Sequence, residues 1–320
     1  MYYSAQIWTS YQKYVRAFGA DIDIATFARL YFERSQGSGA KVPKGMDLAF
    51  QSPASEEERR IKALVDAINA ASASQLEQEL FKQKKRLADA ERKLQTKTTK
   101  KALDDQRIAT GKIDWALGKL SDLRRTREEP RDSRIFPGMH APVMVWENGR
   151  RVVKPMRYQC RMAGTPALFD RKFPGTYNAR RDSLGKFWKG AFGVTHAVMV
   201  ASRFYENVPR HRVEGRELGE GEQEQNVVLE FEPRDGSDML IACLWSRWEG
   251  AADEPDLLSF AAITDEPEPE VAAAGHDRTI INIKPEHLDA WLNPEPGNLE
   301  ALQAIFDDRR HPYYGHRMAA

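Results

Sequence analysis

The sequence of 320 residues is short of cysteine and of long apolar runs. Its only two cysteines, Cys160 and Cys243, lie too far apart for a metal or disulfide motif. We therefore expect a reduced, intracellular setting. No apolar run approaches the roughly 18 residues that a membrane span needs, and the N-terminal segment lacks the basic-then-apolar order of a signal peptide. These absences favour a cytoplasmic protein without a membrane segment.

Proline and glycine are scarce in one long stretch. No proline occurs between Pro53 and Pro130, and the only glycines there are Gly111 and Gly118. Because both residue types interrupt helices, the stretch is typical of long helices. Ser55 followed by three glutamates indicates a helix start. We predict an antiparallel helical hairpin over residues 55–128, inserted into a single domain of residues 1–320.

Two apolar stripes support this hairpin, separated by a weak break at TKTTKK. Their members are Leu80, Leu87 and Leu94 in the first, and Ile108, Ile113, Leu120 and Leu123 in the second. The polar face is strongly basic, through Lys82, Lys84, Lys85, Arg86, Arg92, Lys93, Lys97, Lys100 and Lys101. Such a face is typical of a solvated coiled coil. Two alternatives stay open: an arm that contacts phosphates, and a docking surface for a protein partner.

The remaining sequence mixes helices and strands. Residues 1 to about 52 show helical spacing, whereas strand patterns dominate after Arg134. Asn148-Gly149 and Asp235-Gly236 each predict a β-hairpin turn. Residues 259–264 and 279–283 predict two more strands, and residues 285–292 and 298–308 predict helices. The fold class is therefore α+β, with a curved, mainly antiparallel, barrel-like sheet flanked by helices.

Three polar side chains lie at the borders of apolar segments: Asn178, Glu206 and His276. Each alone has a structural explanation, as a turn residue, a surface acid and a loop histidine. The sequence has no phosphate-binding glycine loop, no HExxH and no GxSxG, so we expect neither a metal nor a cofactor.

The stretches around these residues, taken in order, resemble motifs of the SOS response-associated peptidase (SRAP) family of abasic-site processing proteins. The motif-like stretches are MRYQCR, NARRDS, ASRFYENV, IACLWSRW and AAGHDRTIINI, and the opening YSAQIWTSYQKYVRAFGADIDI resembles a longer-armed bacterial subgroup. Tyr158 and Gln159 replace the family's Trp-Gly, and Asp182 and Ser183 replace its Glu-Thr.

The resemblance implies binding of single-stranded DNA and capture of its abasic sites. In the family, the amine of a cysteine that follows the initiator methionine attacks the sugar aldehyde. The imine that results is then closed by the thiol to a thiazolidine crosslink. The resemblance assigns the positioning of the amine to Asn178 and proton transfers to Glu206 and His276. We expect a raised pKa for Glu206, in an aromatic setting between Tyr205 and Trp248.

The DNA contacts that the resemblance implies involve four further residues. Arg180 and Arg278 are expected to contact phosphates of the bound strand. Phe204 and Tyr205 are expected to be exposed and to stack on bases. The partner is thus single-stranded DNA that carries an abasic site, and the protein would associate with the nucleoid when it is bound to DNA.

The sequence departs from the family at the nucleophile, where Tyr2 stands in place of the cysteine. A phenol cannot form a thiazolidine, and we expect Met1 to remain because aminopeptidase requires a small second residue. Either the substitution was engineered to block crosslinking, or a natural member has lost that step. The alternatives to crosslinking are a non-covalent single-stranded DNA binding module, with Arg180 and Lys82–Lys101 supplying affinity, and a scaffold whose hairpin docks a partner.

Overall fold

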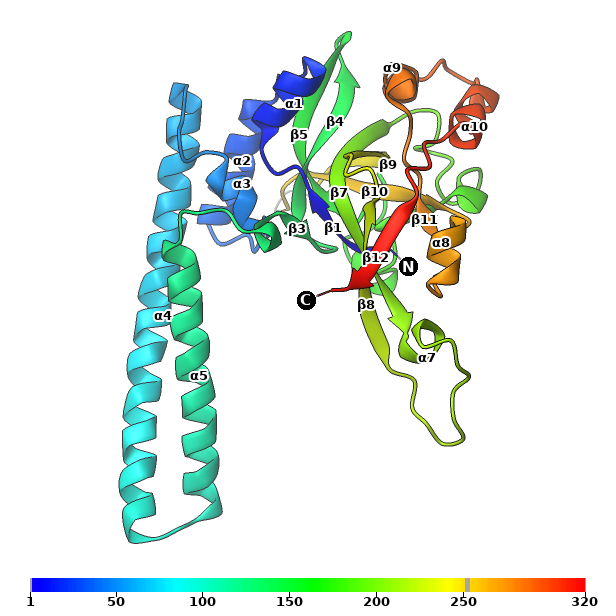
Figure 1. The fold of residues 1–320 in the computed structure, drawn as a ribbon. Coiled ribbons are helices and arrows are strands. Elements are labelled where there is room, and N and C mark those ends of the chain that lie inside the picture. Colours follow the sequence, from blue (N-terminus) through cyan, green and yellow to red (C-terminus); the bar gives the residue numbers. More distant parts are fainter. Residues whose placement is uncertain (1, 251–253, 320) are drawn as a thin grey trace.

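The computed structural model describes residues 2–250 and 254–319, with side chains from Ser4 onward. A twelve-stranded sheet forms its centre, and five strands close into a barrel in the order β10, β5, β4, β7 and β9 (Figure 1). These strands are β4 (His140–Glu147), β5 (Arg150–Tyr158), β7 (His196–Pro209), β9 (Met239–Trp248) and β10 (Leu257–Asp265). All but the β10–β5 pair of the ring are antiparallel, so the α+β class with a barrel-like sheet is confirmed.

Strand β7 is the central strand of the sheet, because it has 14 residues and pairs with other strands along both of its edges. On one edge its first half pairs with β9 and its second half with β8 (Asn226–Pro233). On the other edge its first half pairs with β4 and its second half with β1 (Tyr2–Ile7). Strand β3 (Arg134–Ile135) then covers the far edge of β1.

One predicted β-hairpin is confirmed and the other is wrong. Asn148 and Gly149 have φ of 52° and 78°, and they join β4 to β5. The turn at Gly236 also forms, with φ of 68°. However, in the part of the chain that the structure describes, β8 and β9 pair with different halves of β7 instead of with each other. The turn residues predict where the chain reverses. Strand β7 is long enough to pair with β9 along one half and with β8 along the other, so, among the described strands, β8 and β9 do not form a hairpin with each other.

Shorter elements complete the body. The short strands are β2 (Asp21–Ile22), β6 (Asn178–Arg180), β11 (Thr279–Ile280) and β12 (Tyr314–Met318). The helices are α1 (Tyr11–Phe18), α2 (Ile24–Ser35), α3 (Lys44–Leu48), α6 (Phe169–Lys172), α7 (Arg210–Val213), α8 (Pro269–Ala273), α9 (Leu288–Leu292) and α10 (Leu299–Asp307), and 3-10 turns occupy Pro130–Ser133, Arg181–Ser183 and Pro285–His287. The expectation of helix for residues 1 to about 52 holds for α1–α3 and is wrong for β1.

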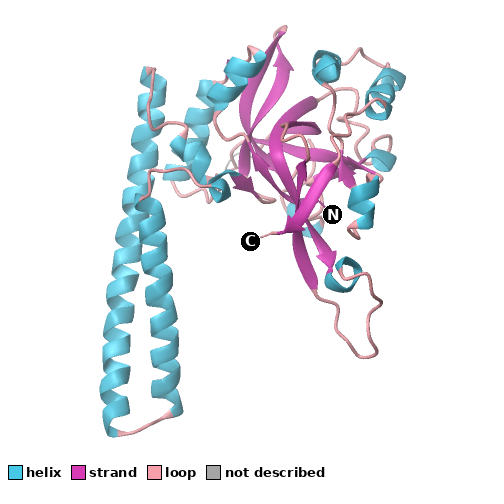
Figure 2. Cartoon of the chain, viewed as in Figure 1, coloured by secondary structure: helices cyan, strands magenta, loops and turns pink. Residues whose placement is uncertain are grey.

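A long helical hairpin projects from this body, formed by α4 (Glu56–Thr96) and α5 (Lys100–Arg124) (Figure 2). The hydroxyl of Ser55 accepts a hydrogen bond from the Glu58 N–H, as expected of a helix cap. Ile61 and Val65 are buried in the core cluster that contains α1–α3, which anchors the base. Beyond the base, four buried alanines bring the helices together: Ala90, Ala102, Ala109 and Ala116.

The described helices were also considered as membrane spans. Even α4, at 41 residues, is too polar along its length, and no described helix combines the length and the apolar character that crossing a membrane requires.

Candidate active site

Glu206 and His276 form a buried acid–imidazole pair. Glu206 lies on β7 and is 1% exposed, and His276 lies between α8 and β11 and is 6% exposed. The Nε2 atom of His276 is 3.2 Å from Oε2 of Glu206. The two residues are seventy positions apart in the sequence, so the contact depends on the path of the sheet. The structure thus brings together Glu206 and His276, the two side chains that were predicted to transfer protons.

Hydrogen bonding orients the imidazole for proton transfer. Its Nδ1 lies 2.9 Å from the carbonyl oxygen of Arg278, which can only accept, so Nδ1 carries a proton. Nε2 therefore faces Glu206 either as an acceptor or, in the imidazolium, as a donor. Burial raises the pKa of Glu206, and the contact with His276 opposes that rise. The pair can hold one proton and move it between carboxyl and imidazole. The expected direction of the Glu206 pKa is confirmed.

The first strand of the chain runs against this pair. In the β1–β7 ladder, Tyr2 lies opposite Glu206 and Ser4 lies opposite Tyr205, so the register shifts between Tyr2 and Ser4. Such bulges re-aim the chain and are frequent beside active sites. The side chain of Tyr2, which occupies the predicted nucleophile position, lies outside the described residues, as does Met1. The described backbone nevertheless places position 2 beside the buried acid.

A polar and cationic contact holds β1 in this register. Ser4 is fully buried, and its hydroxyl accepts a hydrogen bond from Nε of Arg134 on β3 at 3.0 Å. The Arg134 guanidinium also lies 3.7 Å from the centre of the Tyr205 ring, at the distance of a cation–π contact. The Tyr205 hydroxyl in turn donates to Oε1 of Gln6 at 3.3 Å. These contacts tie β3, β1 and β7 together at the edge of the site.

Asn178 lies at the start of β6, on the opposite side of β10 from β11. Its Cα partner in the parallel ladder is Ala262. Two residues further along β10, Thr264 pairs with Arg180 of β6 on one edge and with Ile280 of β11 on the other. The backbone N–H of Asn178 donates to Gly175 at 3.1 Å. The segments that carry Asn178 and His276 therefore flank the same strand.

The two predicted phosphate-contacting arginines have acidic neighbours. Arg180 makes two hydrogen bonds to Asp182, at 2.7 and 3.1 Å, and about half of its side chain is exposed. Arg278 is mostly buried, and its Nε lies 3.6 Å from Asp277. A phosphate would compete with these carboxylates for both guanidinium groups. Their role in binding DNA stays a prediction.

The expectation that Phe204 and Tyr205 are exposed is wrong. Phe204 is fully buried and Tyr205 is 5% exposed. Phe204 stacks on Phe231 of β8, with ring centres 4.9 Å apart. Phe204 also packs against Tyr314, and the Arg134 guanidinium lies over the Tyr205 ring, so both rings face protein. They are therefore unsuited to stack on bases.

Trp248 also lies elsewhere than expected. In the β7–β9 ladder, Leu244 pairs with His196 at the start of β7, and Trp248 lies beyond that end. Glu206 lies in the other direction, near the far end of β7. The indole N–H of Trp248 donates to Thr165. The expected contact between Trp248 and Glu206 is therefore wrong, and burial within the sheet provides the apolar setting of this acid.

An open cavity of about 540 Å³ borders the imidazole. It is lined by His276, Asp277, Arg212 and Arg216, among others. Gly275, with φ of 92°, allows the close approach, because a Cβ there would lie 2.9 Å from Cβ of Arg212. The sequence analysis did not select these two arginines. The basic run RHRVEGR, directly after the Glu206 motif, was the available signal.

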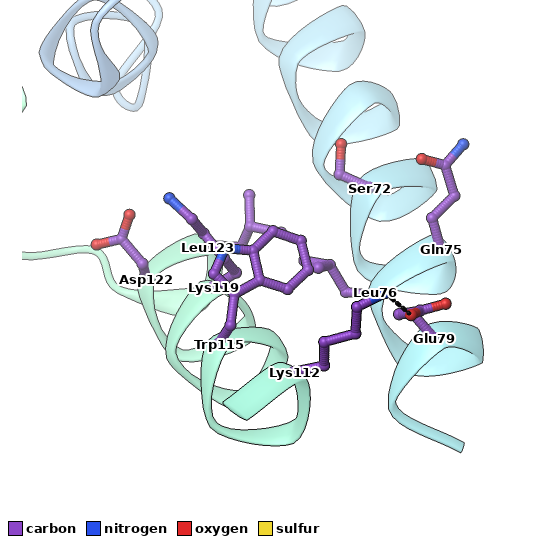
Figure 3. Close-up of a pocket in the computed structure, with 9 residues that line it drawn as sticks. All are labelled: Ser72, Gln75, Leu76, Glu79, Lys112, Trp115, Lys119, Asp122 and Leu123. Carbon is purple, nitrogen blue, oxygen red and sulfur yellow. Dashed lines mark ion pairs between the residues drawn. The ribbon is translucent and has the colours of Figure 1, made fainter. Parts of the chain in front are cut away.

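A second cavity, of about 730 Å³, lies on the hairpin between α4 and α5 (Figure 3). The indole of Trp115 is 54% exposed, and Lys112 forms an ion pair with Glu79 across the cavity at 3.6 Å. None of the predicted site residues lines it. Within residues 2–250 and 254–319, no group of three potential metal ligands is close enough to hold an ion.

A family comparison covers more than half of the chain. The family described as SOS response associated peptidase (SRAP) matches residues 92–317. No curated protein matches the sequence.

Three of the solved structures that are similar to part of this chain come from two bacteria. A protein from Bordetella bronchiseptica has 20% identity over 59% of this chain and 87% of its own, with a TM-score of 0.47. One from Bacteroides thetaiotaomicron has 11% identity over 59% and 78% of the two chains, with a TM-score of 0.46. A phage-related protein from Bordetella bronchiseptica has 17% identity over 61% and 84%, with a TM-score of 0.44.

Proposed function

Because the chain belongs to the SRAP family, whose function is associated with DNA damage and abasic sites, we propose that it binds single-stranded DNA at an abasic site. The observation that carries the proposal is the pairing of Tyr2 with Glu206, with His276 3.2 Å from that acid. The N-terminal strand and a proton-transfer pair thus lie together. An abasic sugar held beside β1 would have both an acid and a base within reach.

The chemistry of a captured abasic site requires several proton transfers. The closed deoxyribose must lose the proton of its C1 hydroxyl and gain one on the ring oxygen to expose the aldehyde. An amine then adds to the aldehyde carbon, and the carbinolamine loses water, which requires protonation of the leaving hydroxyl. Glu206, with its raised pKa, is suited to donate that proton, and His276 is suited to return it. Asn178 would orient the amine through its side-chain amide.

Tyr2 limits how far this reaction proceeds in the present chain. The family's stable product needs a thiol that adds to the imine carbon, with its proton passing to nitrogen. A phenol on the same residue does not close that five-membered ring. We propose that this chain retains recognition of the abasic strand and lacks the thiazolidine step. Cys160 and Cys243 are both buried, and burial raises the pKa of each thiol, so neither replaces the missing nucleophile.

The test restores the thiol. The Tyr2→Cys variant is incubated with a single-stranded oligonucleotide that carries one abasic site, and the products are separated on a denaturing gel. We expect a stable, slowly migrating band with Tyr2→Cys and none with the parent protein or with undamaged DNA. Adding Glu206→Gln to Tyr2→Cys should slow the appearance of the band, because the proton donor is removed. Intact mass reports whether the initiator methionine has been removed.

Tyr2→Ser is the matched control, since serine also permits removal of the methionine but supplies no thiol. It should form an imine that borohydride traps and that otherwise reverses. Absence of any band from Tyr2→Cys, with the methionine confirmed as removed, would contradict the proposal.

The substitution at position 2 also favours a second candidate, a DNA-binding protein with no covalent step. Equal affinity of the parent protein for intact and abasic strands, measured by fluorescence anisotropy, would support this candidate over specific abasic-site recognition.

A further inference from the structure

Charge is divided unequally between the hairpin and the rest of the chain. Residues 81–112, which form the distal part of α4 and α5, contain eleven Lys and Arg and four Asp and Glu. Their net charge is +7, whereas the whole chain has +1, so all other residues together carry −6. The near-neutral total therefore hides a basic arm on an acidic body. Figure 1 shows this part of the hairpin extending away from the barrel.

Most of the positive charge on this arm is not neutralised by neighbouring acids. Five of the eleven cations form ion pairs with acids of the hairpin: Lys82, Arg86, Arg92, Arg107 and Lys112. Six other cations are exposed and, within the described residues, have no carboxylate within 4.0 Å: Lys84, Lys85, Lys93, Lys97, Lys100 and Lys101. Their charge is available to an external partner.

The position of two of these lysines is unfavourable for the helix itself. Lys100 and Lys101 occupy the first turn of α5, which contains no acidic residue. The N-terminal end of a helix carries partial positive charge and is stabilised by acids. The first turn of α4, with Glu56, Glu57 and Glu58, follows that rule. Helix stability therefore does not account for the lysines at the start of α5.

We infer that the distal hairpin, residues 81–112, is a second DNA-contacting surface, which binds the phosphate backbone of duplex DNA that flanks the damaged strand. The inference rests on the proposed function, which supplies a DNA partner. Lysine and threonine, which make up residues 96–101 at the tip of the hairpin, are residue types that contact phosphates without reading sequence. Binding of this kind is electrostatic and releases counterions.

The chemistry of the arm favours duplex over single-stranded DNA. Single-strand binding surfaces combine positive charge with aromatic rings on which unstacked bases lie. Within the arm the one aromatic ring is that of Phe81, exposed at the proximal boundary, and residues 82–114 contain no Phe, Tyr or Trp. The nearest such ring on α5, that of Trp115, lies in the proximal cavity beside Lys119 and Leu123. The lysines from Lys84 to Lys101 therefore have no aromatic ring between them, and such a surface matches a duplex, whose bases are stacked inside and whose phosphate charge is dense.

The length of the arm determines how much duplex DNA is needed to reach its tip. Val65 is buried at the base, and Lys97 follows α4 directly. The helical rise of 1.5 Å per residue places the tip about 48 Å from the base. At 3.4 Å per base pair, this equals about 14 base pairs of duplex. Lys84, the first of the lysines without an ion pair in the described residues, lies about 28 Å from the base by the same rise, so duplex shorter than about 8 base pairs would contact the body alone.

The test removes charge from the arm and varies the DNA. The arm variant carries Lys84→Gln, Lys85→Gln, Lys100→Gln and Lys101→Gln. The control variant removes four positive charges from the proximal hairpin, through Arg59→Gln, Arg60→Gln, Lys62→Gln and Lys119→Gln. Affinity is measured by fluorescence anisotropy at several salt concentrations. The probes are an abasic single strand and the same strand joined to duplex flanks shorter and longer than the arm.

We expect the affinity of the arm variant for the long-flanked DNA to fall roughly tenfold or more, with a salt dependence shallower by about 0.9 for each phosphate that the variant no longer neutralises. Affinity for the single strand should not change, and the control variant should bind as the parent does. Circular dichroism should show equal helix content in all three proteins. Unchanged affinity of a folded arm variant for long-flanked DNA, or an equal decrease in the control variant, would overturn the inference.

Crosslinking separates the two proposals. In the Tyr2→Cys background, the arm variant should still crosslink a short abasic single strand, because the arm lies outside that reaction. Crosslinking together with unchanged affinity for long-flanked DNA would overturn the arm surface alone. No crosslinking together with reduced affinity for long-flanked DNA in the arm variant would overturn the covalent proposal and support the arm surface.

Discussion

Gln159 adopts a backbone conformation that residues other than glycine rarely adopt. Its φ is 122°, and the surrounding bonds hold it there. Its N–H donates to the Phe260 carbonyl, and its own carbonyl accepts two hydrogen bonds from Arg157. The similar stretch of the SRAP family has glycine at this position. The exchange of glycine for glutamine therefore leaves a local strain at the end of β5.

Replacing Gln159 should reveal this strain. Gln159→Gly and Gln159→Ala both remove the side-chain hydrogen bond to the Asp170 carbonyl, but only glycine accepts the positive φ freely. We expect Gln159→Gly to exceed Gln159→Ala in free energy of unfolding by about 1 kcal/mol. Urea denaturation measures the difference. Equal stability of the two variants would show that the conformation is not strained.

The candidate site residues differ in how far the sequence could locate them. Glu206 and His276 stood out because each ends an apolar segment and resembles a family motif. Their direct contact could not be predicted, because it depends on how the α8–β11 segment, whose strand pairs with β10, packs beside the end of β7. The aromatic pair before Glu206 was misjudged for the same reason, since both faces of β7 are covered there.

Among the helices and strands, long periodic segments were predictable and pairings were not. The hairpin followed from its missing prolines, and the predicted start at Ser55 agrees with its capping bond. The packing of its distal part differs from the leucine stripe: alanines are buried there, and Leu80, Leu87 and Leu94 are only half-buried. Strand β1 has only six residues, too few for periodicity to separate it from helix.

Two glycines weaken α5 without a compensating packing role. Gly111 and Gly118 are exposed, and a Cβ at either position would meet no atom within 4 Å. Glycine inside a helix costs free energy relative to alanine because it loses more backbone entropy. We expect Gly111→Ala and Gly118→Ala each to stabilise the hairpin by about 0.5–1 kcal/mol. Slower amide hydrogen exchange along α5 would show this.

Gly149→Ala is the matched control for these two substitutions. Gly149 has φ of 78° in the β4–β5 turn, so alanine there should lower stability. Weaker protection along α5 in Gly111→Ala would contradict the prediction.

For the chain as a unit, a buried histidine predicts sensitivity to acid. His196 accepts a hydrogen bond from the Gly193 N–H at Nε2, and Nδ1 lies 2.7 Å from the Trp291 carbonyl. Only the neutral ring satisfies both partners. Burial lowers the pKa of His196 from 6.5 to about 4, although the bond to Trp291 opposes this. His196 therefore binds a proton more readily in the unfolded chain than in the folded one. The free energy of unfolding that the neutral ring contributes is fully present above pH 6.5 and is lost as the pH falls towards 4.

The decrease in stability expected from His196 alone is roughly 3 kcal/mol between these pH values. His196→Asn should be less stable than the parent near neutral pH, because it lacks the ring that stacks on Trp291. The two proteins should then converge as the pH falls, since asparagine does not titrate. Urea denaturation across this range measures both curves, and parallel curves would contradict the assignment.

The opposite charges of arm and body give the molecule a large permanent dipole moment. The electric field of a polyanion such as DNA would orient this dipole before contact, so that the basic arm points towards the polyanion. Association would then be faster than the near-zero net charge suggests, and added salt would slow it by shortening the distance over which that torque acts.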